Sequence, residues 1–113
     1  MYRNVINWYL QRITGVLLLL LLIAHFWVEH YVADNVRRGE LTYQIVLARV
    51  SHPYWQVIDI SFLLIALYHG LNGVRNILLD YNFNRSTVRV CTVALFLVGL
   101  VWAYWGIEAF SKL

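Results

Sequence analysis

The sequence predicts an all-α membrane protein with three transmembrane helices. Hydrophobic residues make up 61% of the 113 residues and charged residues only 13%, which is more apolar side chain than a small soluble core can cover. Three stretches, about 13–33, 57–79 and 90–110, each approach the roughly 20 apolar residues needed to cross a bilayer. The rest is short ends and two loops, so we expect residues 1–113 to form a single transmembrane domain with no soluble catalytic part.

The first stretch, about 13–33, has a secretory signal as its competing interpretation, because two arginines and then a run of leucines follow the first residue. The apolar run is longer than the hydrophobic core of such a signal, and no small-residue cleavage site follows it. We therefore expect a membrane span. Aromatic residues at its far end, Trp27 and Tyr31, suit a membrane interface.

The segment between the first two stretches is amphipathic. Leu41, Ile45, Val46 and Ala48 group on one side of a helix within 34–51, which predicts a short interfacial helix. Pro53 is the only proline and marks the turn into the second span. The third stretch contains glycines but no histidine, so we expect it to serve in packing.

Several function classes are excluded by charge and cysteine content. The net charge of +3 is spread over loops and ends, and no basic cluster forms a face for nucleic acid. Cys91 is the only cysteine, so the chain has no internal disulfide and no cysteine-based metal site. Five basic residues against four flank the spans on the two sides, a difference too small to orient the chain in the membrane.

His69 is the most informative residue of the chain, because an ionisable side chain in the middle of a hydrophobic span is costly and indicates function. At helical spacing, His69 shares one side of the helix with Asn72, Gly73, Asn76 and Asp80. This polar stripe does not suit lipid. A histidine with Gly73 one turn away can present its imidazole to a flat macrocycle while the macrocycle approaches the backbone.

His25 and His69 are the two histidines well inside spans, and counting from the span ends puts both near mid-membrane. Neutral imidazole is the usual axial ligand of haem in an apolar site, so haem iron is the metal we expect both to bind. Two alternatives stay open. In the first, the histidines bind no haem and serve as interhelical hydrogen-bond donors. In the second, His25 and His69 of this chain both ligate one haem that lies between them.

Three further polar residues follow His69 toward the end of the second span. Arg75 lies two turns away and suits pairing with a carboxylate such as a haem propionate. Tyr81, beside Asp80, has a hydroxyl that can hydrogen-bond the carbonyl oxygen of a lipid-soluble quinone and help move a proton to it. His30 and His52 fall at membrane edges, where we expect ordinary interfacial residues; a hydrogen bond from either to a haem propionate or a quinone stays open as the alternative.

The pattern His-x-x-x-Gly-x-x-x-x-x-x-Asp-Tyr, filled by His69, Gly73, Asp80 and Tyr81, resembles the smaller hydrophobic membrane anchor of succinate dehydrogenase (succinate:quinone oxidoreductase, respiratory complex II). The resemblance extends to the blocks 12–16, 51–59 and 69–75 and covers most of residues 12–81. The blocks are most similar to bacterial anchors that bind two b haems, in which each of two anchor chains supplies one ligand per haem.

The resemblance implies that His69 is an axial ligand of the haem b nearer the iron–sulfur subunit, with Tyr81 and Asp80 near the quinone. It implies that His25 ligates a second haem b, farther away. The expected partners are a second membrane anchor subunit, the iron–sulfur subunit, the flavoprotein subunit and membrane lipid. The expected location is the bacterial inner membrane, with the amino terminus in the cytoplasm.

The expected role is electron transfer from the iron–sulfur subunit through haem b to a membrane quinone, with the chemistry on succinate in a partner. The chain itself has no dinucleotide fingerprint and no cysteine array. The competing hypothesis is a cofactor-free structural or assembly membrane protein whose histidines make helix–helix contacts. Haem absorption bands in the purified complex distinguish the two.

Overall fold

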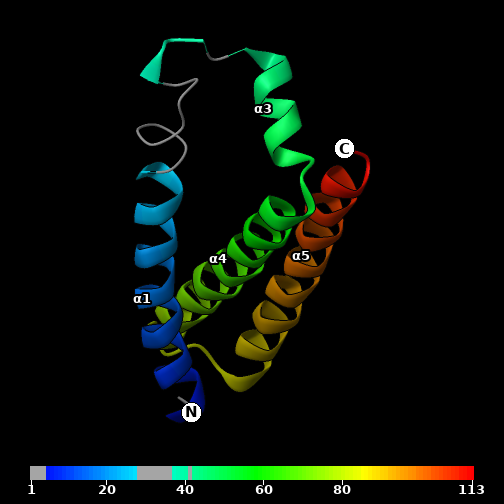
Figure 1. Ribbon diagram of the computed structural model, residues 1–113. Coiled ribbons are helices and arrows are strands. Elements are labelled where there is room, and N and C mark those ends of the chain that lie inside the picture. Colours follow the sequence, from blue (N-terminus) through cyan, green and yellow to red (C-terminus); the bar gives the residue numbers. More distant parts are fainter. Residues whose placement is uncertain (1–4, 28–36, 41) are drawn as a thin grey trace.

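The computed structural model describes residues 5–27, 37–40 and 42–113, and four helices run through them (Figure 1). They are α1 (Val5–Trp27), α3 (Tyr43–Val50), α4 (Pro53–Asp80) and α5 (Arg85–Ser111). Three of these, α1, α4 and α5, are long and apolar enough to cross a membrane. The all-α fold with three spans is thus confirmed, and the chain is a multi-pass membrane protein.

The predicted span boundaries are least accurate at α1. This helix begins at Val5 rather than near residue 13, and residues 28–33 of the predicted span lie outside the described residues. The polarity of Gln11 and Arg12 is what predicts a start after them. Both continue the helix instead, since the Arg12 guanidinium lies 4.1 Å from the centre of the Trp8 ring and the Gln11 amide turns toward α4.

The short helix predicted within 34–51 is confirmed over Tyr43–Val50, while Leu41 lies outside the described residues. Thr42 caps it, its side-chain oxygen accepting a hydrogen bond from the Ile45 N–H. Pro53 opens α4, as predicted. His52 caps α4, because its Nδ1 accepts from the Tyr54 N–H at 3.2 Å.

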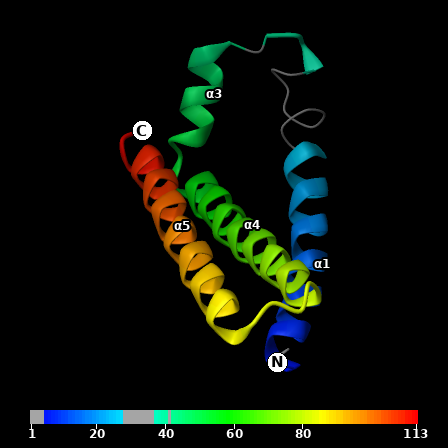
Figure 2. The ribbon, with the colours of Figure 1, turned by 180° about the vertical axis from the view of Figure 1, so that it is seen from behind.

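α4 is the central helix and packs against both α1 and α5. Figures 1 and 2 show α1 and α4 crossing near the N-terminal end of α1 and separating toward its other end. Glycines bring α5 close to α4: a Cβ at Gly99 would lie 2.7 Å from Leu71, and a Cβ at Gly106 would overlap Leu63. Small residues that let helix backbones approach are the usual packing device in membranes.

The described part of the chain has almost no core of its own. Within it, Val88 is the buried apolar residue and Asn72 the buried polar one. Large apolar side chains cover the outer surfaces of all three spans. Such a surface is stable against lipid or against further apolar helices, not against water.

Candidate functional site

His69 points from α4 toward α1 and is half-buried between the two helices. Its Nδ1 lies 3.1 Å from Thr14 Oγ1. A Cβ on Gly15 would come within 3.1 Å of His69 Cε1, so the imidazole packs directly on the α1 backbone at this glycine. Among the residues described, no group makes a hydrogen bond with His69 Nε2.

Gln11 ties α1 to the same turn of α4. Its Nε2 donates a hydrogen bond to the His69 carbonyl oxygen at 3.1 Å, and its Oε1 accepts one from Asn72 Nδ2 at 2.7 Å. A Cβ on Gly73 would lie 3.2 Å from Gln11 Nε2, so the space above Gly73 holds this amide. Asn72 is 9% exposed, and its partner Gln11 satisfies a polar group that would be costly to leave unpaired.

Sequence reasoning missed Gln11, Thr14 and Gly15 as members of the site. Their spacing does carry a signal, because positions i, i+3 and i+4 of a helix share one face, and on this face of α1 all three residues are polar or small. Treating Gln11 as the boundary of a span hides that face.

His25 faces α4 nearer the opposite end of α1. Its Nδ1 lies 3.7 Å from Asp59 Oδ1, and its ring stacks against Phe62 at a centroid distance of 6.0 Å. The His25 side chain is 40% exposed, against 15% for Asp59. A carboxylate next to a ring N–H is the usual partner of a metal-binding histidine, and Asp59 is a residue to which the sequence alone assigns no role.

The expectation that both histidines lie at a similar depth near mid-membrane is wrong. His69 is level with Thr14, and His25 lies eleven residues further along α1, a rise of about 16 Å. The error comes from the α1 boundary, since the expected depth of His25 is counted from Arg12. One iron held between His25 and His69 needs both rings within a few ångström of it, so this geometry contradicts the single bridged haem.

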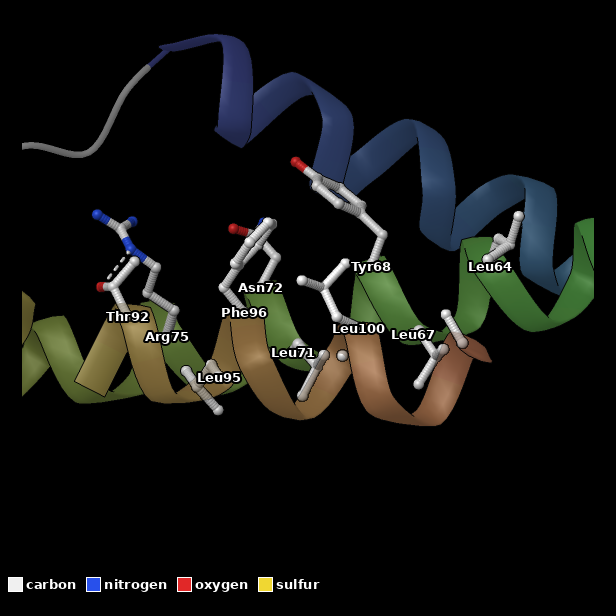
Figure 3. Close-up of a pocket in the computed structure, with 12 residues that line it drawn as sticks. Leu64, Leu67, Tyr68, Leu71, Asn72, Arg75, Thr92, Leu95, Phe96 and Leu100 are labelled. Atoms are coloured by element: carbon white, nitrogen blue, oxygen red, sulfur yellow. Dashed lines mark hydrogen bonds between the residues drawn. The ribbon is translucent and has the colours of Figure 1, made fainter. Parts of the chain in front are cut away.

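Arg75 lies on another face of α4 and points toward α5, where its Nε donates to Thr92 Oγ1 at 3.1 Å. Together they form the polar end of a groove of about 270 Å³ between α4 and α5 (Figure 3). Leucines and Phe96 line much of the remainder, and Asn72 and Tyr68 lie along it. The structure therefore brings His69 to α1 and Arg75 to α5, rather than both to one surface.

Asp80 is the last residue of α4 and Tyr81 is its C-cap, as the sequence predicted. Tyr81 is 69% exposed, and its ring stacks on that of Phe83 at a centroid distance of 6.0 Å. Tyr81 lies twelve residues beyond His69, which is about 18 Å along α4. His30 lies outside the described residues.

Fold and site together define a multi-pass helical membrane protein with a polar, histidine-bearing contact between two spanning helices. Comparison with known proteins adds the family. The chain belongs to the succinate dehydrogenase/fumarate reductase transmembrane subunits, whose family pattern matches residues 2–107.

Individual relatives are named as membrane anchor subunits of succinate dehydrogenase. The succinate dehydrogenase hydrophobic membrane anchor subunit of Archaeoglobus fulgidus is 35% identical over 98 residues, which cover 84% of this chain and 80% of the relative. The protein of the same name in Thermoplasma acidophilum is 26% identical over 101 residues, covering 89% of this chain and 80% of the relative. The resemblance inferred from the His69–Tyr81 pattern is confirmed at the level of the anchor family. The di-haem bacterial type stays a prediction.

Proposed function

We propose that this chain binds haem b through His69, contributes to a quinone site at Tyr81 and Asp80, and passes electrons from the iron–sulfur subunit to a membrane quinone. The observation that carries the proposal is the state of His69. It is half-buried between two spanning helices, with Nδ1 engaged by Thr14 and with Nε2 free of hydrogen bonds in the described part of the chain.

The donor chemistry of His69 fits haem. An imidazole in an apolar setting with one nitrogen held and the other available is the usual axial ligand, and a bound haem supplies a one-electron carrier within the membrane. His69 is one ligand, so the second would come from the partner anchor subunit. Gly73 keeps the α4 surface low one turn from the histidine, but the Gln11 amide occupies that space, so Gly73 would act by admitting Gln11 and not by contact with the haem itself.

His25, with Asp59 beside its Nδ1 at 3.7 Å, would hold a second haem. The roughly 16 Å between the two levels supports separate haems rather than a shared one. Arg75 faces α5 and not the surface of His69, so it would pair with a propionate only of a haem that reaches the α4–α5 groove. Thr92 uses its Nε, and among the described residues its terminal nitrogens remain donors.

Tyr81 would hydrogen-bond a quinone carbonyl and Asp80 would orient or supply the proton. The exposed Tyr81 ring at the end of α4 supports this role, since a membrane quinone must reach its site from lipid. Partners in this function are a second anchor subunit, the iron–sulfur subunit and the flavoprotein subunit. The chain would lie in the bacterial inner membrane, with its amino terminus in the cytoplasm.

The test is His69→Ala in the intact complex, with haem counted chemically and by its reduced absorption bands. The variant should lose one haem, because alanine has no group that donates to iron. His52→Asn is the matched control, since it also removes a histidine while keeping an N-cap acceptor. Unchanged haem content in His69→Ala refutes the ligand assignment.

One observation favours the cofactor-free alternative. The contact between His69 Nδ1 and Thr14 is itself an interhelical hydrogen bond, which a purely structural histidine would also make. Under that alternative the purified complex containing this chain shows no haem bands assignable to His69, and His69→Ala changes only the stability of the α1–α4 pair.

A further inference from the structure

We propose that Thr14 is a positioning residue for His69: its hydroxyl accepts the Nδ1–H, which leaves the lone pair of the imidazole on Nε2, facing away from the threonine. The proposal rests on the proposed function, in which His69 ligates haem. It adds that Nε2 is the ligating atom, that Thr14 selects this atom, and that Thr14 changes the midpoint potential of the haem in a stated direction.

The direction of the Thr14–His69 hydrogen bond follows from a count of protons. A threonine hydroxyl has one proton and two lone pairs. Thr14 Oγ1 lies 2.6 Å from the Leu10 carbonyl oxygen, a group that only accepts. The hydroxyl proton is therefore directed at Leu10, and at His69 Nδ1, 3.1 Å away, Oγ1 presents a lone pair. Nδ1 must then be the protonated nitrogen of the neutral ring.

Gly15 restricts the position of the His69 ring, in addition to the protonation that Thr14 selects. Cε1 lies between the two ring nitrogens, and it is the atom that a Cβ on Gly15 would approach to 3.1 Å. The imidazole thus has the α1 backbone against one edge and the Thr14 hydroxyl at Nδ1. A ring held at two points keeps Nε2 in one direction, which is what an axial ligand requires.

The Gln11 contacts hold Thr14 and Gly15 opposite His69. Gln11 bonds both the His69 carbonyl oxygen and the Asn72 side chain, and it occupies the space above Gly73. These contacts fix the register of α1 against α4 within one helical turn of Thr14. A slip of α1 by one residue would rotate Thr14 by about 100° away from His69.

The Nδ1–H bond has an electronic consequence. A histidine that donates its second ring N–H to an acceptor becomes a more basic ligand, and a more basic ligand favours the oxidised state of the iron. Thr14 should therefore lower the midpoint potential of the haem that His69 ligates. Removal of the hydroxyl should raise this potential without removing the ligand.

The experiment compares hydroxyl-free and hydroxyl-bearing residues at position 14 in the intact complex. Thr14→Val and Thr14→Ala remove the acceptor, and Thr14→Ser keeps it. Ser61→Ala is the matched control, because Ser61 Oγ bonds the carbonyl of Val57 four residues earlier, as Thr14 bonds Leu10. Redox titration of the haem bands gives the midpoint potential, and electron paramagnetic resonance of the oxidised haem reports the ligand orientation.

The expected result is a higher midpoint potential and an altered resonance for the His69 haem in the valine and alanine variants. Thr14→Ser and Ser61→Ala should match the parent. Equal potentials in all four variants overturn the proposal, as does an equal shift in all four. Failure of the proposed function gives a different result from failure of the Thr14 proposal. If the proposed function fails, His69→Ala keeps its haem. If only the Thr14 proposal fails, His69→Ala loses its haem and the Thr14 variants have the same midpoint potential.

Discussion

The two ends of the α1–α4 pair hold their histidines in different ways. Near the crossing of the helices, His69 is packed on Gly15 and bonded to a hydroxyl at 3.1 Å, and the Gln11 amide ties the backbones together. Toward the other end, His25 meets a carboxylate at 3.7 Å and an aromatic ring, and 40% of its side chain is exposed. Packing on a glycine and hydrogen bonds hold the first histidine, whereas a longer contact with a carboxylate and a ring stack hold the second.

The difference shows what this chain supplies alone and what an assembly would add. The residues that hold the His69 ring, Thr14 and Gly15, both belong to this chain, so the position of the ring is set when α1 and α4 pair. The His25 side chain remains more open, and a further helix would be needed to enclose it. We expect the two histidines to respond differently to mutation for this reason.

The largest effect should come from the histidines themselves. His25→Ala and His69→Ala should each remove a different haem component, because His25 lies about 16 Å further along α1 than Thr14, the residue that His69 contacts. The double variant should lack both. Low-temperature spectra of the reduced complex resolve the components, and loss of the same component in both single variants would contradict two separate sites.

A smaller effect is expected from Gln11→Leu. It removes two interhelical hydrogen bonds and leaves the buried Asn72 amide without its partner, at a cost of about 1–2 kcal/mol. The temperature at which the His69 haem is lost should fall, with the His25 haem less affected.

Gln56→Leu is the matched control for Gln11→Leu, because Gln56 Nε2 makes the corresponding bond to the Phe110 carbonyl, but across α4 and α5. It should leave the His69 haem at the parent temperature. An equal loss in both variants would mean that the α1–α4 contact has no special role in holding His69.

Tyr81→Phe tests whether electrons leave at the His69 end of the chain. Loss of one hydrogen bond to the quinone carbonyl should cost on the order of 1 kcal/mol, and therefore several-fold in the rate of quinone reduction. Haem content and electron transfer to a soluble dye, which bypasses the membrane site, should stay at parent values. A parent-like quinone rate would leave Tyr81 as an interfacial residue.

The smallest change should come from Gly15→Ala. The added methyl group lies 3.1 Å from His69 Cε1, so the ring must move by a few tenths of an ångström and the haem resonance should shift slightly. Gly70→Ala is the control, because a Cβ there meets nothing within 4 Å although Gly70 is next to His69 in sequence. Identical spectra for both variants would argue against a ring seated on Gly15.

The fold could be predicted because it follows from length and hydropathy, which are local properties of the sequence. The start of α1 could not, because the interfacial cue at Gln11 and Arg12 is overridden by contacts with Trp8 and with α4. His69, Asp80 and Tyr81 could be chosen from residue type and spacing. The pairing of Thr14 with His69 and of Asp59 with His25 could not be predicted, since spacing shows which residues share a helix face but not how two helices are rotated and aligned against each other.

The short link between α4 and α5 has a consequence for how the protein is made. Four residues, 81–84, join the two helices, and Asn84 caps α5 by accepting from the Thr87 N–H. Lipid gives helices no hydrophobic drive to associate, so proximity along the chain matters more than in water. The α4–α5 hairpin should therefore assemble as a unit during insertion. The first helix, already in the bilayer, should then dock on this hairpin through Gln11, and the contact between α1 and His69 should be the last part of the fold to form.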